Sequence, residues 1–232
     1  MPIHADAEVR ISAFRWVPDF ARGQVRDLRV RWALEEAGIP YAVRKLDAMV
    51  ERPADYFAEQ PFGQVPSYRD GRVQLFESGA IVLHVGERSE ALLPRDEAGR
   101  ARAVAWCFAA LNSVEPLIMQ LAAIDLFHQD AGWARERRPE VVKLIEGRLD
   151  RLVDWLEDRD WLEDRFTAGD LLMVTVLRIL DHTDLVAARP ALAAYKDRGT
   201  KRPAFARALA AQLADFEDAA GAARPLASAE RS

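Results

Sequence analysis

Patterns typical of β-strands occur only before residue 80 of this 232-residue chain, and the remainder carries helical patterns alone. Val9 to Phe14 alternates between the two faces of a short strand, and Tyr41 to Leu46 predicts a second one. Between them, Asp27 to Ala37 places apolar residues at helical spacing, and Gly38 ends that helix. A strand–helix–strand unit of this kind forms a right-handed crossover with its two strands parallel.

The stretch GQVPSYRDGRVQLFES, residues 63–78, predicts a hairpin followed by a helix. Apolar and polar residues alternate on both sides of Asp70-Gly71, which is a strong hairpin turn signal. Pro66 has no N–H to give to a strand ladder, so it must lie where that hydrogen bond is not needed. Ser78 begins another apolar helix. We therefore expect the order β-α-β-(short helix)-β-β-α.

Helices fill the second half of the predicted structure. Residues 101–128 form one long apolar-striped segment, which Pro116 should kink or divide. Residues 141–157 are amphipathic, and residues 171–180 are apolar nearly all round, which predicts a central buried helix. The expected organisation is an α/β domain (1–93), a linker (94–98), an all-helical domain (99–220) and a flexible tail (221–232).

Composition and charge narrow the classes of function. A formal net charge of −5 argues against a general nucleic-acid surface, and 50% hydrophobic residues with 30% charged residues are typical of a soluble globular protein. No secretory signal is visible, nor is any uninterrupted apolar run long enough to span a membrane. Cys107 is the single cysteine, which suits a reducing cytoplasm. We expect it to be a small core residue. The histidines have no metal-ligand spacing, so we expect no metal; they are His4, His84, His128 and His182.

Four stretches of the chain resemble the cytosolic glutathione transferases. They are RVRWALEEAGIPY (29–41), QPFGQVPSYRDGRVQLFESGAI (60–81), LLPRDEAGRARAVAW (92–106) and FTAGDLLMV (166–174). The second stretch is the most specific, because spacing and residue type match together. The resemblance implies a thioredoxin-like α/β N-terminal domain, an all-α helical-bundle C-terminal domain, a glutathione site in the cleft between them, and a homodimer.

The resemblance also assigns a glutathione-binding set. It implies that the Val65-Pro66 bond is cis and that Val65 hydrogen-bonds the cysteinyl backbone of glutathione as an added strand. Ser78, at a helix start, would hold the γ-glutamyl carboxylate, and Glu77 would pair with the ammonium group. Gln64 lies where many relatives have a Lys or Gln near the ligand. The alternatives without a ligand are an edge-strand proline and a serine that only caps its helix.

Two further pairs of residues receive expectations. Arg44 or Lys45 would meet the glycyl carboxylate of glutathione, although no motif places either one. Thr167 and Asp170 form a capping box before an apolar helix, and we interpret that box as structural.

The loop at the expected sulfur position, RWVPDFARGQVRD (15–27), contains no Tyr, Ser or Cys, whereas catalytic relatives hold the sulfur with one of these. The matching position falls near Gly23 or Gln24. A thiol of pKa about 8.5 needs about 2 kcal/mol to be half ionised at pH 7, and one hydrogen bond from a charged donor contributes about 1.5–3 kcal/mol. The candidate donors are the Gln24 amide, Arg22 or Arg26, and free N–H groups at the helix start. We assign Gln24 and Arg26 as catalytic.

The alternative for these arginines is a solvated helix face, since Asp27–Arg31 and Arg31–Glu35 are spaced as i,i+4 pairs. The sequence predicts an enzyme that binds glutathione, ionises its thiol and adds it to a small apolar electrophile. The loop 15–26 and the helix 101–128, which carries Trp106 and Phe108, would shape the electrophile pocket. A glutathione-transferase-like binding module without turnover is the alternative function.

Overall fold

The computed structural model describes residues 3–216, so the tail expected over 221–232 lies outside the described residues. The first half contains β1 (Val9–Phe14), η1 (Asp19–Ala21), α1 (Asp27–Ala37), β2 (Tyr41–Leu46), η2 (Ala54–Ala58), β3 (Ser67–Arg69), β4 (Gln74–Phe76) and α2 (Ser78–Gly86). The second half contains α3 (Glu97–Phe108), η3 (Ala109–Val114), α4 (Glu115–Phe127), α5 (Gly132–Leu156), α6 (Ala168–Arg178), η4 (Ile179–His182), α7 (Pro190–Thr200) and α8 (Pro203–Asp215).

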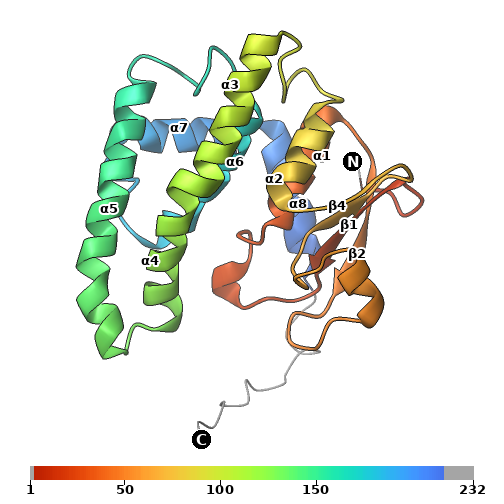
Figure 1. Ribbon diagram of the computed structural model, residues 1–232, viewed down its shortest axis with the longest axis horizontal. Helices are drawn as coiled ribbons and strands as arrows, with labels where there is room; N and C mark the ends of the chain where they lie inside the picture. The colour runs from red at the N-terminus through yellow and green to blue at the C-terminus, as the bar shows by residue number, and fades with distance from the viewer. Residues whose placement is uncertain (1–2, 217–232) are drawn as a thin grey trace, which may run out of the picture.

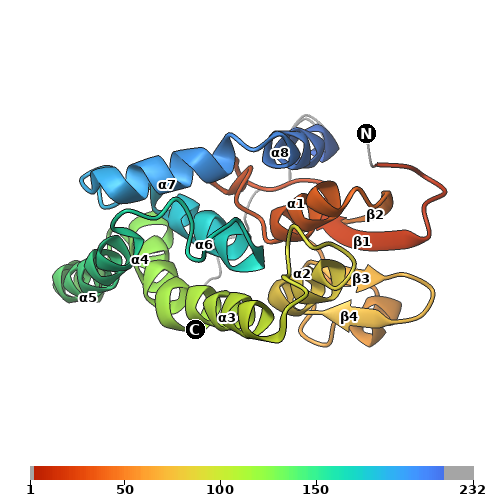
Figure 2. The same ribbon diagram turned by 90° about the horizontal axis from the view of Figure 1, so that it is seen from above.

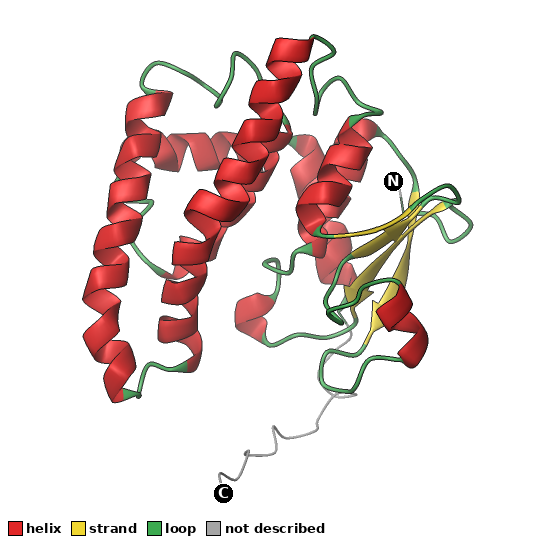
Figure 3. Cartoon of the chain, in the orientation of Figure 1, coloured by secondary structure: helices red, strands yellow, loops and turns green. Residues whose placement is uncertain are grey.

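The strands form one four-stranded sheet in the order β2-β1-β3-β4. Figure 3 shows these strands in yellow beside the red helices. β1 and β2 are parallel, with Val9 opposite Tyr41, while β3 runs antiparallel to both β1 and β4. The predicted crossover and hairpin are therefore confirmed, and so is the fold class of an α/β domain followed by an all-helical region (Figure 1).

Helices α1 and α2 lie between the sheet and the helical region (Figure 2). Their apolar residues join a core that runs from β1 into α6. α6 is buried from Ala168 to Leu177, which confirms the predicted central helix. Its first turn is held by the predicted capping box, in which Thr167 accepts a hydrogen bond from the Gly169 N–H and Asp170 accepts one from the Thr167 N–H.

The long apolar segment is divided, as predicted, and Pro116 lies in the first turn of α4. The helix begins earlier than expected, at Glu97, because Asp96 accepts a hydrogen bond from the Gly99 N–H at 2.7 Å and caps it. η3, the turn between α3 and α4, is a π-helix. The segment Glu97–Phe127 is long and apolar enough to cross a membrane, with a mean hydropathy of 1.4 in its most apolar stretch. The core helix of a soluble protein can be equally long and apolar, and 44% of this stretch is buried.

The alternative of a solvated face does not hold for α1, although the Asp27–Arg31 pair forms as its i,i+4 spacing suggested. Arg31 is fully buried, and its Nε donates to Asp27 at 2.7 Å while its Nη2 donates to Asp215 at 2.6 Å. Glu35 accepts a hydrogen bond from Arg207 instead of pairing with Arg31. The cause is α8, which packs over this side of α1 and brings its own charged residues (Figure 2).

Candidate functional site

Two adjoining cavities form one cleft between the sheet domain and α4. The first cavity, of about 620 Å³, lies at the start of α2, and the second, of about 590 Å³, lies beside loop 15–26. Both are lined by a shared set of side chains, namely Arg26, Arg29, Gln64, Glu115 and Met119. The cleft is therefore continuous across residues that come from both halves of the chain.

Val65 lines the second cavity with its main-chain hydrogen-bonding groups unpaired among the described residues. The Val65-Pro66 bond is cis, as the resemblance implied. Within residues 3–216, no hydrogen bond engages the N–H or C=O of Val65. Hydrogen bonds fix the residue before Val65: the Tyr56 hydroxyl donates to the Gln64 carbonyl at 2.5 Å and lies 2.6 Å from Ser12 Oγ. An extended peptide could thus pair with Val65 as it would with a sheet edge.

The start of α2 lines the first cavity. Glu77 is the N-cap residue with φ of 68°, a left-handed conformation that is uncommon outside glycine and often marks functional sites. Ser78 is the first helical residue, so its interpretation as the cap itself is wrong. The Ser78 hydroxyl is buried and accepts a hydrogen bond from Arg29 Nη1 at 3.3 Å. A guanidinium, a hydroxyl and a helix N-terminus therefore converge on one anion-binding position.

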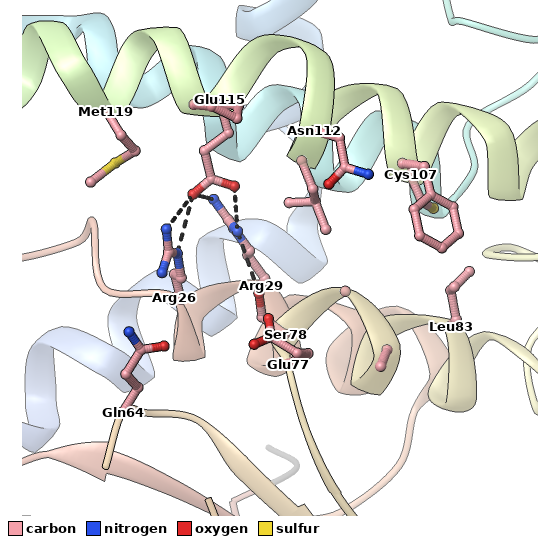
Figure 4. A pocket seen from close by; sticks show the side chains of 15 residues that line it. Arg26, Arg29, Gln64, Glu77, Ser78, Leu83, Cys107, Asn112, Glu115 and Met119 are labelled. Carbon is pink, nitrogen blue, oxygen red and sulfur yellow. Dashed lines mark hydrogen bonds and ion pairs between the residues drawn. The ribbon is translucent and has the colours of Figure 1, made fainter. Parts of the chain in front are cut away.

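Arg26, Arg29 and Glu115 form a charged cluster at the junction of the two cavities (Figure 4). Glu115 Oε1 accepts from Arg26 Nη2 at 2.9 Å and from Arg29 Nη2 at 3.0 Å, while its Oε2 accepts from Arg29 Nη1 at 3.1 Å. Burial alone would raise the pKa of Glu115, but the two guanidinium groups hold that pKa below its usual value. Glu115 is thus ionised, and the cluster carries one net positive charge.

The local structure of the long helix places Glu115. It is the first residue of α4, directly after η3, and π-helical turns of this kind are frequent at functional sites. Figure 4 shows the Glu115 carboxylate directed from α4 toward α1. Sequence reasoning missed Glu115 and Arg29; the available signal was an acid before Pro116, at the predicted break.

The second cavity is mainly aromatic and aliphatic. The rings of Phe20 and Phe127 meet edge to face at 5.3 Å, and both are exposed. Phe14 and Met119 contribute further apolar lining. Loop 15–26 and the helix over 101–128 thus meet here, where the sequence placed the electrophile pocket. Phe108 lines the first cavity instead, and Trp106 donates its indole N–H to Glu163.

The loop residues proposed as sulfur donors differ in their surroundings. Gln24 lines the second cavity, but its amide donates to the Arg178 carbonyl at 3.3 Å. Arg22 lies over the Phe216 ring and outside both cavities. Arg26 lines both cavities and is held by Glu115. Of these three side chains, Arg26 is the one with both access to the cleft and a fixed position.

The expectation for Arg44 and Lys45 is wrong. Arg44 pairs with Asp55 and Glu59, and Lys45 pairs with Asp215, so neither lines the cleft. Both belong to β2, no residue of which lines either cavity. The basic residue that does line the second cavity from this region is Arg52, which donates to the Gly63 carbonyl at 2.9 Å and which no sequence motif marked.

The described residues offer neither a reactive cysteine nor a metal-binding cluster. Cys107 borders the first cavity but is only 2% exposed, and burial raises the pKa of its thiol to about 12. It stays protonated at neutral pH and acts as a small core residue. Among residues 3–216, no three side chains of His, Cys, Asp or Glu are grouped to hold a metal ion.

Comparison with known proteins gives concordant matches. The family profile described as "Glutathione S-transferase, N-terminal domain" matches residues 20–87. Glutathione S-transferase 4 of Zea mays is 30% identical over 192 residues, which are 76% of this chain and 83% of that protein. A glutathione transferase family member from Pseudomonas fluorescens, solved with two glutathione bound, superposes with a TM-score of 0.77 at 20% identity, covering 87% of this chain and 92% of that one. Ure2p in complex with glutathione gives a TM-score of 0.75 at 21% identity, with coverages of 88% and 93%.

Proposed function

The chain belongs to the glutathione S-transferase family, and we propose that it binds glutathione in the cleft and adds the glutathione sulfur to a small apolar electrophile. One observation supports this most. Val65, whose main chain has no hydrogen-bond partner among the described residues, lines the second cavity, and the Ser78–Arg29 pair lines the first; Gln64 lines both. An extended tripeptide with a charged end requires such a pair of sites.

Each part of glutathione has a partner in this proposal. Val65 pairs with the cysteinyl backbone, as an added strand does. Ser78, Arg29 and the N-terminus of α2 hold the γ-glutamyl carboxylate, and Glu77 meets the ammonium group. Arg52, which lines the cavity next to Gln64, takes the glycyl carboxylate in place of Arg44 or Lys45.

Arg26 is the proposed donor to the sulfur. Its side chain is 42% exposed at the junction of the cavities, and Glu115 fixes it there. The charged Arg26 guanidinium favours a thiolate over a thiol. Because about 2 kcal/mol suffices for half ionisation at pH 7, one charged hydrogen bond can replace the missing hydroxyl. Gln24 is a weaker donor, since its amide already donates to Arg178.

The electrophile occupies the second cavity, against the rings of Phe14, Phe20 and Phe127. The thiolate sulfur attacks its electrophilic carbon and forms a C–S bond, and the displaced electron pair goes to a leaving group or takes up a proton. The apolar lining favours such a body over a polar one because it removes apolar surface from water.

Replacing Ser78 with Ala tests the binding site. We expect glutathione binding, measured by calorimetry, to weaken about tenfold, because the γ-glutamyl carboxylate loses a charge-assisted hydrogen bond. Ser89→Ala, in the turn that follows α2, is the matched control and should bind as the parent does. An unchanged dissociation constant for Ser78→Ala would refute this placement. No thermal shift with millimolar glutathione would refute the function itself.

We also propose that the protein acts in the cytoplasm, as a homodimer, in the detoxification of electrophiles. The single cysteine supports a reducing compartment. An exposed aromatic pair supports association: Phe62 is 68% exposed and its ring lies 6.1 Å from that of Phe76. A light-scattering mass of one 26.1 kDa chain would contradict the dimer.

A further inference from the structure

The second cavity contains more positive charge than its own acids neutralise. Its charged lining residues are Arg26, Arg29, Arg52, Arg178, Glu115, Asp181 and the titratable His182. Arg26 and Arg29 share Glu115, and Asp181 pairs with Lys196, which lies outside the lining. Arg52 and Arg178 have no ion pair with any carboxylate of residues 3–216. In a chain of net charge −5, this cavity is a local positive site.

Arg178 is held firmly in this lining. It is the last residue of α6, its Nη1 donates to the Gly23 carbonyl at 2.8 Å, and its guanidinium lies 5.0 Å from the centre of the Phe205 ring. Partial burial lowers the pKa of Arg178, and the negative charge of Asp181 opposes that shift. A half-buried guanidinium that lines a cavity is a favourable partner for a carboxylate, because partial desolvation strengthens the ion pair.

Glutathione does not account for this charge. In the proposed function its carboxylates meet Ser78 with Arg29 at one end and Arg52 at the other. Arg178 lines the second cavity and not the first, together with Phe20, Phe127 and other apolar residues. The unneutralised guanidinium therefore lies on the side of the cleft that receives the electrophile.

We propose that the electrophile is an apolar or aromatic compound that carries a carboxylate, and that Arg178 is the residue that selects for it. This inference rests on the proposed function and specifies its second substrate. The rings of Phe14, Phe20 and Phe127 contact the apolar body, and the Arg178 guanidinium receives the carboxylate.

A pair of chloronitrobenzenes that differ in charge tests the inference. The probes are 1-chloro-2,4-dinitrobenzene, which is neutral, and 4-chloro-3,5-dinitrobenzoate, which carries a carboxylate. In both, the glutathione sulfur forms a C–S bond, the C–Cl bond breaks, and chloride leaves with the electron pair. Each kcat/KM is divided by the rate constant of the uncatalysed reaction, so that intrinsic reactivity cancels.

We expect the protein to prefer the carboxylated probe by about tenfold in this ratio, the effect of one charge-assisted hydrogen bond. Arg178→Met keeps the apolar stem and should abolish the preference. Arg22→Met removes one positive charge from the same region without touching the cavities, and should keep it. No preference in the parent protein, or an equal fall for both probes in Arg178→Met, would overturn the inference; the second result would make Arg178 an anchor of the loop.

Binding of the two reaction products separates this inference from the proposed function. The S-conjugates of glutathione with each probe are titrated by calorimetry, which needs no turnover. If turnover is absent but the carboxylated conjugate binds about tenfold tighter, and Arg178→Met removes the difference, the inference stands and the proposed transferase activity fails. Equal affinity of the two conjugates for the parent protein overturns the inference whatever the activity.

Discussion

At the scale of single residues, the central feature is the Arg26 guanidinium, which we propose as the donor to the glutathione sulfur in place of a hydroxyl. A hydroxyl donates one hydrogen bond and carries no charge, whereas a guanidinium donates several and is always charged. Arg26 therefore needs an acid to hold it in one position, and Glu115 does this with two hydrogen bonds, at 2.9 and 3.1 Å. Its chemistry in the cleft is electrostatic, and it cannot act as a general base.

Replacing Arg26 with Met should raise the pKa of the bound glutathione thiol toward its free value of about 8.5, because the nearest cation is lost. Below that pKa the thiolate fraction falls about tenfold per pH unit, so activity should fall most at pH 6–7 and recover at high pH. The ultraviolet absorbance of the thiolate, titrated in the complex, reports the pKa directly. Arg26→Lys keeps the charge and should raise the pKa less. An identical thiol pKa in all three proteins would exclude Arg26 as the donor.

Residue-level signals in the sequence were local, and the predicted cis Val65-Pro66 bond is confirmed. Val65-Pro66 and Ser78 lie in one stretch, and the structure brings both to the cleft. Arg29 had no such signal, because RVRW is also an ordinary helix sequence and its partner Glu115 is 86 residues away. Contacts of that separation depend on how the two halves of the chain pack, which a single sequence does not specify.

At the scale of elements, the capping box of α6 is both a start signal and a buried acid. Asp170 is fully buried and accepts hydrogen bonds from the N–H groups of Leu162 and Thr167 and from the Tyr195 hydroxyl. Burial outweighs these hydrogen bonds and raises the pKa of Asp170 to about 6. The sequence predicted the capping box, but it did not predict that Tyr195 of α7 packs against the Asp170 carboxyl.

This pKa predicts a pH dependence of stability. Between the unfolded pKa of about 3.9 and the folded value of about 6, the folded protein holds a proton that the unfolded chain has lost. The contribution of Asp170 to the free energy of unfolding is therefore full below about pH 4 and falls by up to about 1.4 kcal/mol per pH unit toward pH 6. Asp170→Asn cannot titrate and should show a smaller decline.

Urea unfolding at several pH values between 4 and 7 measures this difference. Asp154→Asn, which replaces an exposed acid on α5, is the matched control and should follow the parent protein. Parallel curves for Asp170→Asn and the parent would show that the buried carboxyl has no raised pKa.

Element bounds were less predictable than element types. α5 begins at Gly132 and includes Pro139, whereas the amphipathic pattern suggested a start near residue 141. Within the amphipathic stretch, Val141 is buried and Leu144 is 43% exposed. Pro139 lies inside α5, beyond the first turn where proline is normally tolerated, so a pattern-based bound set after Pro139 is too late.

At the scale of the whole molecule, α1 ties the two halves of the chain together. The Trp32 ring is fully buried, 4.9 Å from the Phe205 ring of α8 and 5.7 Å from that of Phe166. Around these rings, Glu36 receives two hydrogen bonds from Arg202. Because the helix that carries Arg26 and Arg29 is fixed by α8, the cleft depends on the C-terminal helices for its shape.

Phe205→Ala should therefore destabilise both halves together. Removing a buried ring typically costs about 3–5 kcal/mol, and we expect one cooperative transition at a lower temperature. Circular dichroism melting gives the stability, and hydrogen exchange of the α1 amides reports the N-terminal half. Phe57→Ala removes an exposed ring and is the control. Two separate transitions, with α1 exchange unchanged, would show that the halves are energetically independent.

The arrangement of Arg26, Arg29 and Glu115 has an evolutionary consequence. A chain that lost Glu115 would leave two buried or half-buried cations side by side. A chain that lost both arginines would leave the buried Glu115 carboxylate without either of these ion-pair partners. Substitutions at these three positions should thus be accepted in descendants only in concert. Related sequences with a hydroxyl or thiol at the start of α1 should lack the acid before the proline of α4, and an alignment can test that covariation.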